Sequence, residues 1–111
     1  MNGEVKYGKT VKVFFGKREA DDEVRFDVTY YILKTEIEAN EIKTDTYGIQ
    51  IDKIDFFTDD MESAEEIDIS LNLFDVEVLA KRLYENSATP QDLHSISEDF
   101  VQEINCLPNV S

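Results

Sequence analysis

The chain has 111 residues, and its 25 Asp and Glu side chains against 11 Lys and Arg give a formal net charge of −14 at pH 7. A field of that sign repels nucleic acid and anionic membranes, which excludes direct binding to a polyanion and favours a basic protein as partner. No apolar stretch approaches the roughly 20 residues of a membrane span, and the one cysteine, Cys106, fits a reducing cytoplasm.

The charge is unevenly distributed along the chain. Residues 1–20 hold five Lys and Arg and two acids, for a net charge of +3, whereas residues 21–111 carry −17. No Lys or Arg follows Arg82. This asymmetry favours an oriented contact with a basic partner over a charge that serves only solubility.

The first half of the chain alternates apolar and polar residues with the two-residue period of strands. Polar stretches at residues 16–22 and 36–46 predict connections between strands. After Asp52 the apolar positions shift phase to Ile54 and Phe56, which predicts a bulge or an early strand end. The predicted strands cover residues 11–15, 24–32, 47–52 and 67–71.

The second half of the chain changes to a helical period. One amphipathic helix is predicted between Asn72 and the break at residues 86–88, and a second begins at Pro90. Asn72 and Thr89 are the expected N-caps, and Pro90 suits the first helical position. The apolar stripes of the two helices contain Val76, Leu79, Ala80, Leu83, Tyr84, Leu93, Ile96, Phe100 and Ile104.

The element order is therefore β-β-β-β-α-α. Four successive strands with short connections favour an antiparallel meander, and two amphipathic helices can cover one of its faces. The sequence predicts a single acidic α+β domain over residues 1–111, in which a four-stranded antiparallel meander is followed by a helical hairpin packed on one face.

The densest acidic segment, residues 52–68, offers rows of carboxylates. Alternate strand residues lie about 6.6 Å apart, about twice the ~3.4 Å rise per nucleotide, so such rows can imitate phosphates in the basic groove of a nucleic-acid-binding protein. The alternative is a solvated acidic surface that aids solubility. The predicted partner-binding residues are Asp52, Asp55, Asp59, Asp60, Glu62, Glu65, Glu66, Asp68, Asp21, Glu23 and Asp27.

No metal, cofactor or catalytic site is predicted. The acidic segment lacks the glycine that a calcium loop needs, and His94 and Cys106 are too few ligands for a transition metal. No carboxylate occupies an obviously buried position, where its pKa would be raised for acid–base catalysis. His94 is expected to form a surface pair with Glu98, one helical turn away. The sequence therefore predicts a protein that is not an enzyme.

Adjacent aromatic residues place some rings outside the core, because neighbours in a strand point to opposite faces. If the helices cover one face of the sheet, the other face carries Tyr31, Leu33 and one of Phe56 and Phe57. That face is either a surface for a partner or dimer, or an instance of ordinary sheet packing.

Three segments carry a resemblance to a known family: DVTYYIL at residues 27–33, TYGIQI at 46–51 and ATPQDL at 88–93. Together they resemble a family of small uncharacterised proteins from clostridia and related Gram-positive bacteria, over residues 24–104. The resemblance implies a bacterial cytosolic origin, and the family brings no assigned activity.

The leading functional hypothesis is a non-enzymatic acidic binding protein that acts on a basic protein surface. Its most specific form is a nucleic-acid mimic that inhibits a nucleic-acid-binding protein, such as a bacterial defence nuclease. The alternative is a housekeeping protein-interaction module that uses the aromatic sheet face, with a homodimer as one form of it.

Overall fold

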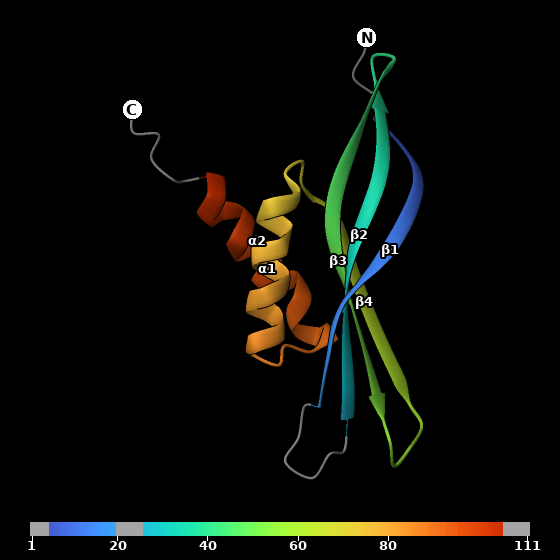
Figure 1. Cartoon of the computed structure of the whole chain (residues 1–111), viewed down its shortest axis with the longest axis vertical. Coiled ribbons are helices and arrows are strands. Elements are labelled where there is room, and N and C mark those ends of the chain that lie inside the picture. The colour runs from blue at the N-terminus through green and yellow to red at the C-terminus, as the bar shows by residue number, and fades with distance from the viewer. Residues whose placement is uncertain (1–4, 20–25, 106–111) are drawn as a thin grey trace.

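The computed structural model describes residues 5–19 and 26–105. The observed order is four strands followed by two helices, as predicted, and the helices lie together on one side of the sheet (Figure 1). The elements are β1 (Lys6–Glu19), β2 (Phe26–Ala39), β3 (Ile42–Asp55), β4 (Met61–Ser70), α1 (Leu73–Glu85) and α2 (Pro90–Asn105).

The four strands form one antiparallel sheet in the order β1-β2-β3-β4, which confirms the predicted meander. The predicted long connection at residues 36–46 is wrong, because β2 and β3 meet at a two-residue turn. Asn40 and Glu41 have φ of 55° and 68° there, the left-handed pair that a tight hairpin requires. The ends of the strands extend past the helices (Figure 1). Both faces of the sheet meet water there, so apolar and polar residues need not alternate at the strand ends.

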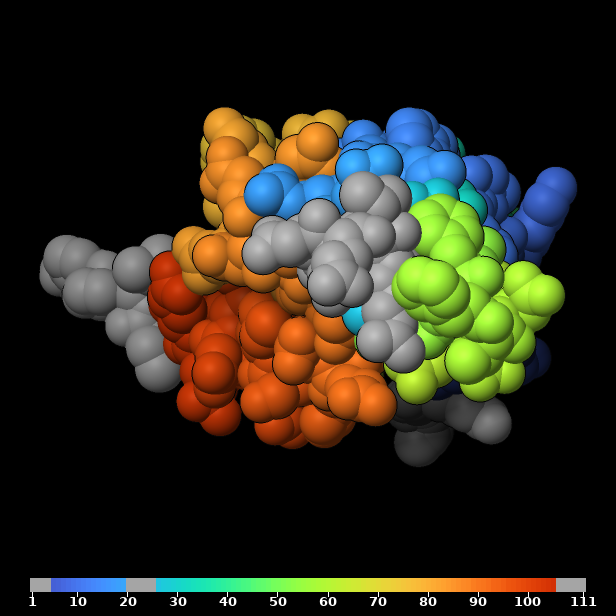
Figure 2. Space-filling view, turned by 90° about the horizontal axis from the view of Figure 1, so that it is seen from below, coloured from blue at the N-terminus to red at the C-terminus, as the bar shows by residue number. Residues whose placement is uncertain are grey.

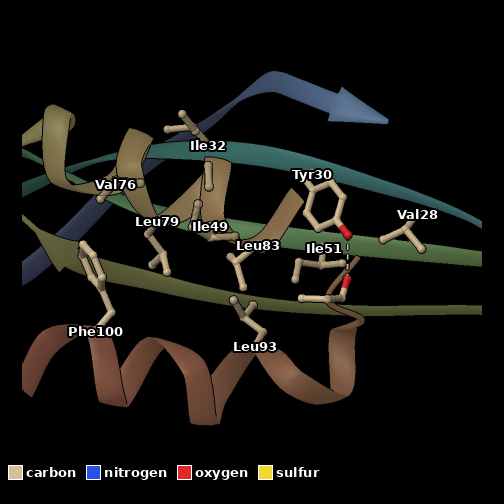
Figure 3. Packing of buried hydrophobic residues seen from close by; sticks show 12 residues of the cluster. Val28, Tyr30, Ile32, Ile49, Ile51, Val76, Leu79, Leu83, Leu93 and Phe100 are labelled. Atoms are coloured by element: carbon tan, nitrogen blue, oxygen red, sulfur yellow. Dashed lines mark hydrogen bonds between the residues drawn. The ribbon is translucent and has the colours of Figure 1, made fainter. Parts of the chain in front are cut away.

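The core lies between the sheet and the two helices (Figure 3). Seen from the end of the β3–β4 turn, both helices lie on the same side of the strands (Figure 2). The predicted helix stripes supply one half of this core, and alternate residues of β2 and β3 supply the other half. The buried core residues are Val28, Tyr30, Ile32, Ile49, Ile51, Val76, Leu79, Ala80, Leu83, Ala88, Leu93 and Phe100.

Polar contacts fix the helical hairpin against the sheet. The Tyr30 hydroxyl donates a hydrogen bond of 2.7 Å to the carbonyl oxygen of Ala88, in the turn between α1 and α2 (Figure 3). Asn72 caps α1 as predicted, because its side-chain oxygen accepts from the Phe74 N–H at 3.0 Å. At the start of α2, the Asp92 carboxylate accepts from both the N–H and the hydroxyl of Thr89.

The strand irregularity is in β4 rather than after Asp52. β3 pairs with β2 without interruption to Asp55, so the predicted bulge or early end at that point is wrong. The apolar positions shift phase after Asp52 because Ile54 lies on the helix-free side of the sheet, where its side chain is 40% exposed. In β4, by contrast, Ser70 pairs with Tyr47 and Glu66 pairs with Ile49, so β4 accommodates two extra residues in a bulge.

The face of the sheet without helices is also partly closed. Leu33 is fully buried there although it belongs to no part of the helix-covered core, and Thr35, Thr46 and Gln50 are buried beside it. The sheet curls strongly enough for the Tyr7 hydroxyl of β1 to donate to the Asp68 carboxylate of β4, at the opposite edge, over 3.0 Å.

Candidate functional site

The most distinctive surface is acidic and combines β4 with α2. The two elements pack against each other, and within their described residues they carry eight Asp and Glu side chains and no Lys or Arg. We call this set the acidic flank: Glu62, Glu65, Glu66, Asp68, Asp92, Glu98, Asp99 and Glu103.

A groove of about 260 Å³ runs between the two elements of the acidic flank. Its lining combines carboxylates with apolar side chains, and the buried Ser97 hydroxyl of this lining has no hydrogen-bond partner among the described residues. A groove of this composition suits a long basic side chain, because the stem can lie on apolar surface while the charged end meets a carboxylate. The lining residues are Glu66, Ile67, Asp68, Ile69, Ser97, Glu98, Val101 and Gln102.

The His94 imidazole lies beside this groove, between two of its carboxylates. Its Nδ1 lies 2.9 Å from a Glu66 oxygen, and its Nε2 lies 3.3 Å from a Glu98 oxygen. The predicted pair with Glu98 is therefore present, and the pair with Glu66 was missed because the two residues are far apart in sequence. The hydrogen bond that Glu66 accepts from the imidazole, together with the charge of Glu98, raises the pKa of His94 above its usual value.

The opposite edge of the sheet has the opposite charge. β1 carries five Lys and Arg and a single acid, Glu19, and it is the edge strand farthest from β4 in the sheet order. The fold thus converts the charge asymmetry of the sequence into two separate surfaces. We call the basic one the basic edge: Lys6, Lys9, Lys12, Lys17 and Arg18.

Four of the predicted contact carboxylates are used inside the molecule. Asp52 is 9% exposed and accepts hydrogen bonds from Ser63 (2.6 Å) and Gln50 (2.8 Å), so the expectation that no carboxylate is buried is wrong. The alternating pattern hid it, because Asp52 lies on the helix-free face that the sheet curl closes. Asp55 accepts from the Phe57 N–H in the β3–β4 turn.

The other two internal carboxylates are tied to neighbouring strands. Asp27 forms an ion pair of 2.7 Å with Lys17, and the hydrogen bond that the Lys17 ammonium donates to Asp27 raises the pKa of that lysine. Asp68 accepts from Thr46 (2.7 Å) as well as from Tyr7.

The remaining predicted contact residues divide by position. Asp59 and Asp60 are exposed in the β3–β4 turn, where they adjoin the exposed Glu62 and Glu65 of β4. Glu66 is half-buried beside His94. Asp21 and Glu23 lie outside the described residues. Within residues 52–68, Asp52 is thus buried, Asp55 and Glu66 are half-buried, and the remaining predicted contact carboxylates are exposed.

The aromatic residues on the helix-free face form a small patch. Phe14 is 60% exposed and meets the half-buried Tyr31 ring edge-to-face, with centroids 6.3 Å apart. The Lys12 ammonium lies 5.6 Å from the Tyr31 ring centroid. Leu33 was predicted on this face with Tyr31, and its side chain is fully buried there. Phe56 and Phe57 are both exposed at the β3–β4 turn.

A second hollow, of about 680 Å³, lies at the end of β1 beside Phe56 and Tyr84. Three of its charged groups have partners, since Lys17 pairs with Asp27 and Arg18 donates to the Tyr84 carbonyl oxygen at 3.1 Å. Within residues 5–19 and 26–105, no group of three or more His, Cys, Asp and Glu side chains is placed to hold a metal ion. Among those same residues, no helix combines the length and apolarity that crossing a membrane requires.

Comparison with known proteins identifies a family for this chain. The model of a family of unknown function, DUF6514, matches residues 10–103, which is close to the 24–104 span of the predicted resemblance. Searches of curated proteins and of solved structures each found no match.

Proposed function

The chain belongs to the DUF6514 family, and we propose that it is a non-enzymatic binding protein that engages a basic surface of another protein through its acidic flank. The observation that carries this proposal is the segregation of charge: eight carboxylates and no Lys or Arg on β4 and α2, with the basic edge on the other side of the sheet.

We take the segregation of charge as support for a contact with a partner rather than for solubility. A surface that serves solubility is expected to intersperse both signs of charge. On the acidic flank, β4 and α2 contribute no Lys or Arg, His94 is held between Glu66 and Glu98, and Arg82 of α1 reaches Glu103 at 3.2 Å. A basic side chain of a partner would enter the same field, with the apolar lining of the groove available for its stem.

The more specific proposal is nucleic-acid mimicry, in which the flank replaces phosphates in the groove of a nucleic-acid-binding protein. Asp60, exposed in the β3–β4 turn, and Glu62, at the start of β4, are two positions apart, and in an extended strand two positions span about 6.6 Å, or about two nucleotide steps. The bacterial cytoplasmic setting implied by the resemblance, and an inhibitory effect on the partner, are parts of this proposal.

A defined basic probe tests the contact. We expect a fluorescent arginine-rich peptide to bind the wild type, with an affinity that falls at least about tenfold between 50 and 200 mM salt. The variant E62Q/E65Q/D99N should weaken binding at low salt, whereas E36Q/E41Q/E77Q, which removes three exposed carboxylates elsewhere, should keep most of it. An equal loss in both variants would show that only net charge matters.

A third variant tests the groove itself. Val101→Lys places a lysine ammonium of the protein itself beside Glu66 and Glu98. This ammonium should compete with the peptide for the two carboxylates. Val101 is half-buried, and the unfolding transition of the variant is measured first to establish that it folds. Unchanged peptide affinity would remove the groove from the proposal and leave only the outer carboxylates.

The mimic is tested by competition. A basic nucleic-acid-binding protein identified by capture from a Gram-positive lysate should lose its labelled DNA duplex as this protein is added. The wild type should displace the duplex and E62Q/E65Q/D99N should do so poorly. A partner that binds the protein and the duplex at the same time contradicts mimicry while leaving the acidic contact intact.

The aromatic patch of Phe14 and Tyr31 supports the second candidate, an interaction module that binds through the helix-free face. Apolar contacts are little affected by salt. Partner binding that is unchanged between 50 and 200 mM salt and is abolished by Phe14→Ser would favour this candidate over the acidic flank.

A further inference from the structure

The backbone of β1 pairs with another described strand on one side only. β1 is an edge strand that pairs with β2 on one side, and within the described residues no strand pairs with its other side. In an antiparallel ladder every second residue turns its N–H and C=O groups away from the paired neighbour. These groups form a template for a further strand.

The register of β1 defines where another strand fits. Shifts between Tyr7 and Thr10 and between Phe14 and Gly16 interrupt the pairing with β2, and residues 10–14 pair regularly between them. Farther along, the second shift ends the regular pairing, and Tyr84 of α1 packs on the helix-side face at Gly16. The regularly paired template is therefore residues 10–14.

Side chains around this template are apolar and exposed. Val11, Val13 and Phe14 are 42%, 55% and 60% exposed, although strands of isolated soluble proteins usually keep such residues covered. Val11 and Val13 face the helix side and Phe14 the helix-free side, so a strand added here would find apolar contacts on both faces.

The lysine charges at this part of β1 indicate which kind of strand would bind there. Lys9 directly precedes residues 10–14 and Lys12 lies within them, with its ammonium 5.6 Å from the Tyr31 ring centroid. A second copy of β1 pairing about its centre would set Lys12 against Lys12, and like charges directly opposite each other are destabilising. Carboxylates at the same cross-strand positions would be attracted.

We propose that residues 10–14 of β1 bind an extended acidic segment of another protein by strand addition. The added strand pairs with the outer backbone groups of β1, places apolar side chains against Val11 and Val13 on one face, and sets carboxylates opposite Lys12 on the other face. The site lies on β1 and includes no residue of β4 or α2, which carry the acidic flank.

The probe is a nine-residue peptide that alternates Glu with Val, compared with the same peptide carrying Lys in place of Glu. We expect the acidic peptide to bind and the basic one not to bind at this edge. Amide exchange measured by NMR should slow at alternate residues of the 10–14 template. Binding without protection of any amide in that template would overturn the proposal.

Two controls separate strand addition from attraction by charge alone. An acidic peptide that is N-methylated at alternate residues retains its charge but loses the donors of one edge, so it should bind at least about tenfold more weakly. The variant K9E/K12E should lose the acidic peptide, whereas K43E/K81E, with the same change of net charge, should retain it. Equal binding of the methylated peptide would contradict strand addition.

A second copy of the chain is the competing occupant. Its acidic flank complements the basic edge, and such a head-to-tail contact would produce open oligomers. Light scattering across a hundredfold range of protein concentration should give the monomer mass throughout. Oligomers that disappear in K9E/K12E would assign the edge to self-association and overturn the proposal.

Discussion

Gly48 is the residue on which the β4 bulge depends most directly. A Cβ built at this position overlaps the Glu66 carbonyl oxygen and lies 2.8 Å from the Ile67 Cα, so the obstacle is backbone rather than a movable side chain. We expect Gly48→Ala to lower the free energy of unfolding by about 3 kcal/mol, at the upper end for overpacking, as measured by urea denaturation.

Gly8 provides the matched control for Gly48. Its added Cβ would lie 3.4 Å from the Glu36 carbonyl oxygen, which is close to an ordinary contact. Gly8→Ala should therefore change the free energy of unfolding by less than about 1 kcal/mol. Similar losses in both variants would mean that the bulge does not need the space at Gly48.

Tyr30 provides a residue-scale prediction that depends on pH. Burial raises the pKa of its hydroxyl from 10.0 to about 12, so the neutral form stabilises the fold below pH 10 and this stability is lost as the pH rises from about 10 to about 12. Tyr30→Phe should lower the free energy of unfolding by about 1–3 kcal/mol at pH 8, because the Ala88 carbonyl loses its donor.

The pH profile distinguishes ionisation from packing at Tyr30. In urea unfolding between pH 8 and pH 11, Tyr30→Phe should show a shallower decline than the wild type. A residual decline is expected in both proteins, because hydrogen bonds also raise the pKa values of Tyr7 and Lys17. Parallel profiles would contradict a role for Tyr30 ionisation.

Among the elements, α1 is the one whose start depends on a single side chain. Asn72→Ala removes the acceptor for the Phe74 N–H and should lower the free energy of unfolding by about 1 kcal/mol. Glu77→Ala, on the exposed side of the same helix, should change it by less than about 0.5 kcal/mol. Equal effects would indicate that the Asn72 cap does not contribute.

The sequence predicts the elements better than their irregularities. The Asn72 cap and the start of α2 at Pro90 depend on neighbouring residues, so local chemistry identifies them. The β4 bulge depends on Gly48 of another strand, and the local pattern of β4 contains no sign of it. The β2–β3 turn was missed because Asn40-Glu41 lacks the glycine that usually marks a tight hairpin.

The same contrast between neighbouring residues and contacts with distant segments explains which features of the candidate surfaces the sequence predicted. Charge counts along the chain predicted the asymmetry, because composition does not depend on folding. The sequence did not predict which carboxylates remain free, since the partners of Asp52 and Asp68 come from other strands or from positions that the curl of the sheet brings together. The β4–α2 groove likewise requires two elements that are distant in sequence.

For the whole molecule, one charge distribution has opposite effects on stability and on binding. Carboxylates that repel one another within the acidic flank destabilise the folded chain, and the same carboxylates attract a basic partner. E62Q/E65Q/D99N should therefore unfold at a higher temperature than the wild type at 20 mM salt, and it should bind the arginine-rich peptide more weakly under the same conditions.

Salt should abolish both differences through the same screening. At 500 mM salt the Debye length falls to a few ångströms, so the wild type and E62Q/E65Q/D99N should unfold at nearly the same temperature and bind the peptide with similarly low affinity. Calorimetry and fluorescence anisotropy measure the two effects on the same samples. If the variant were more stable at low salt yet bound the peptide as tightly as the wild type, the flank carboxylates would lower stability without serving the proposed contact, and the acidic surface would have to be assigned to solubility alone.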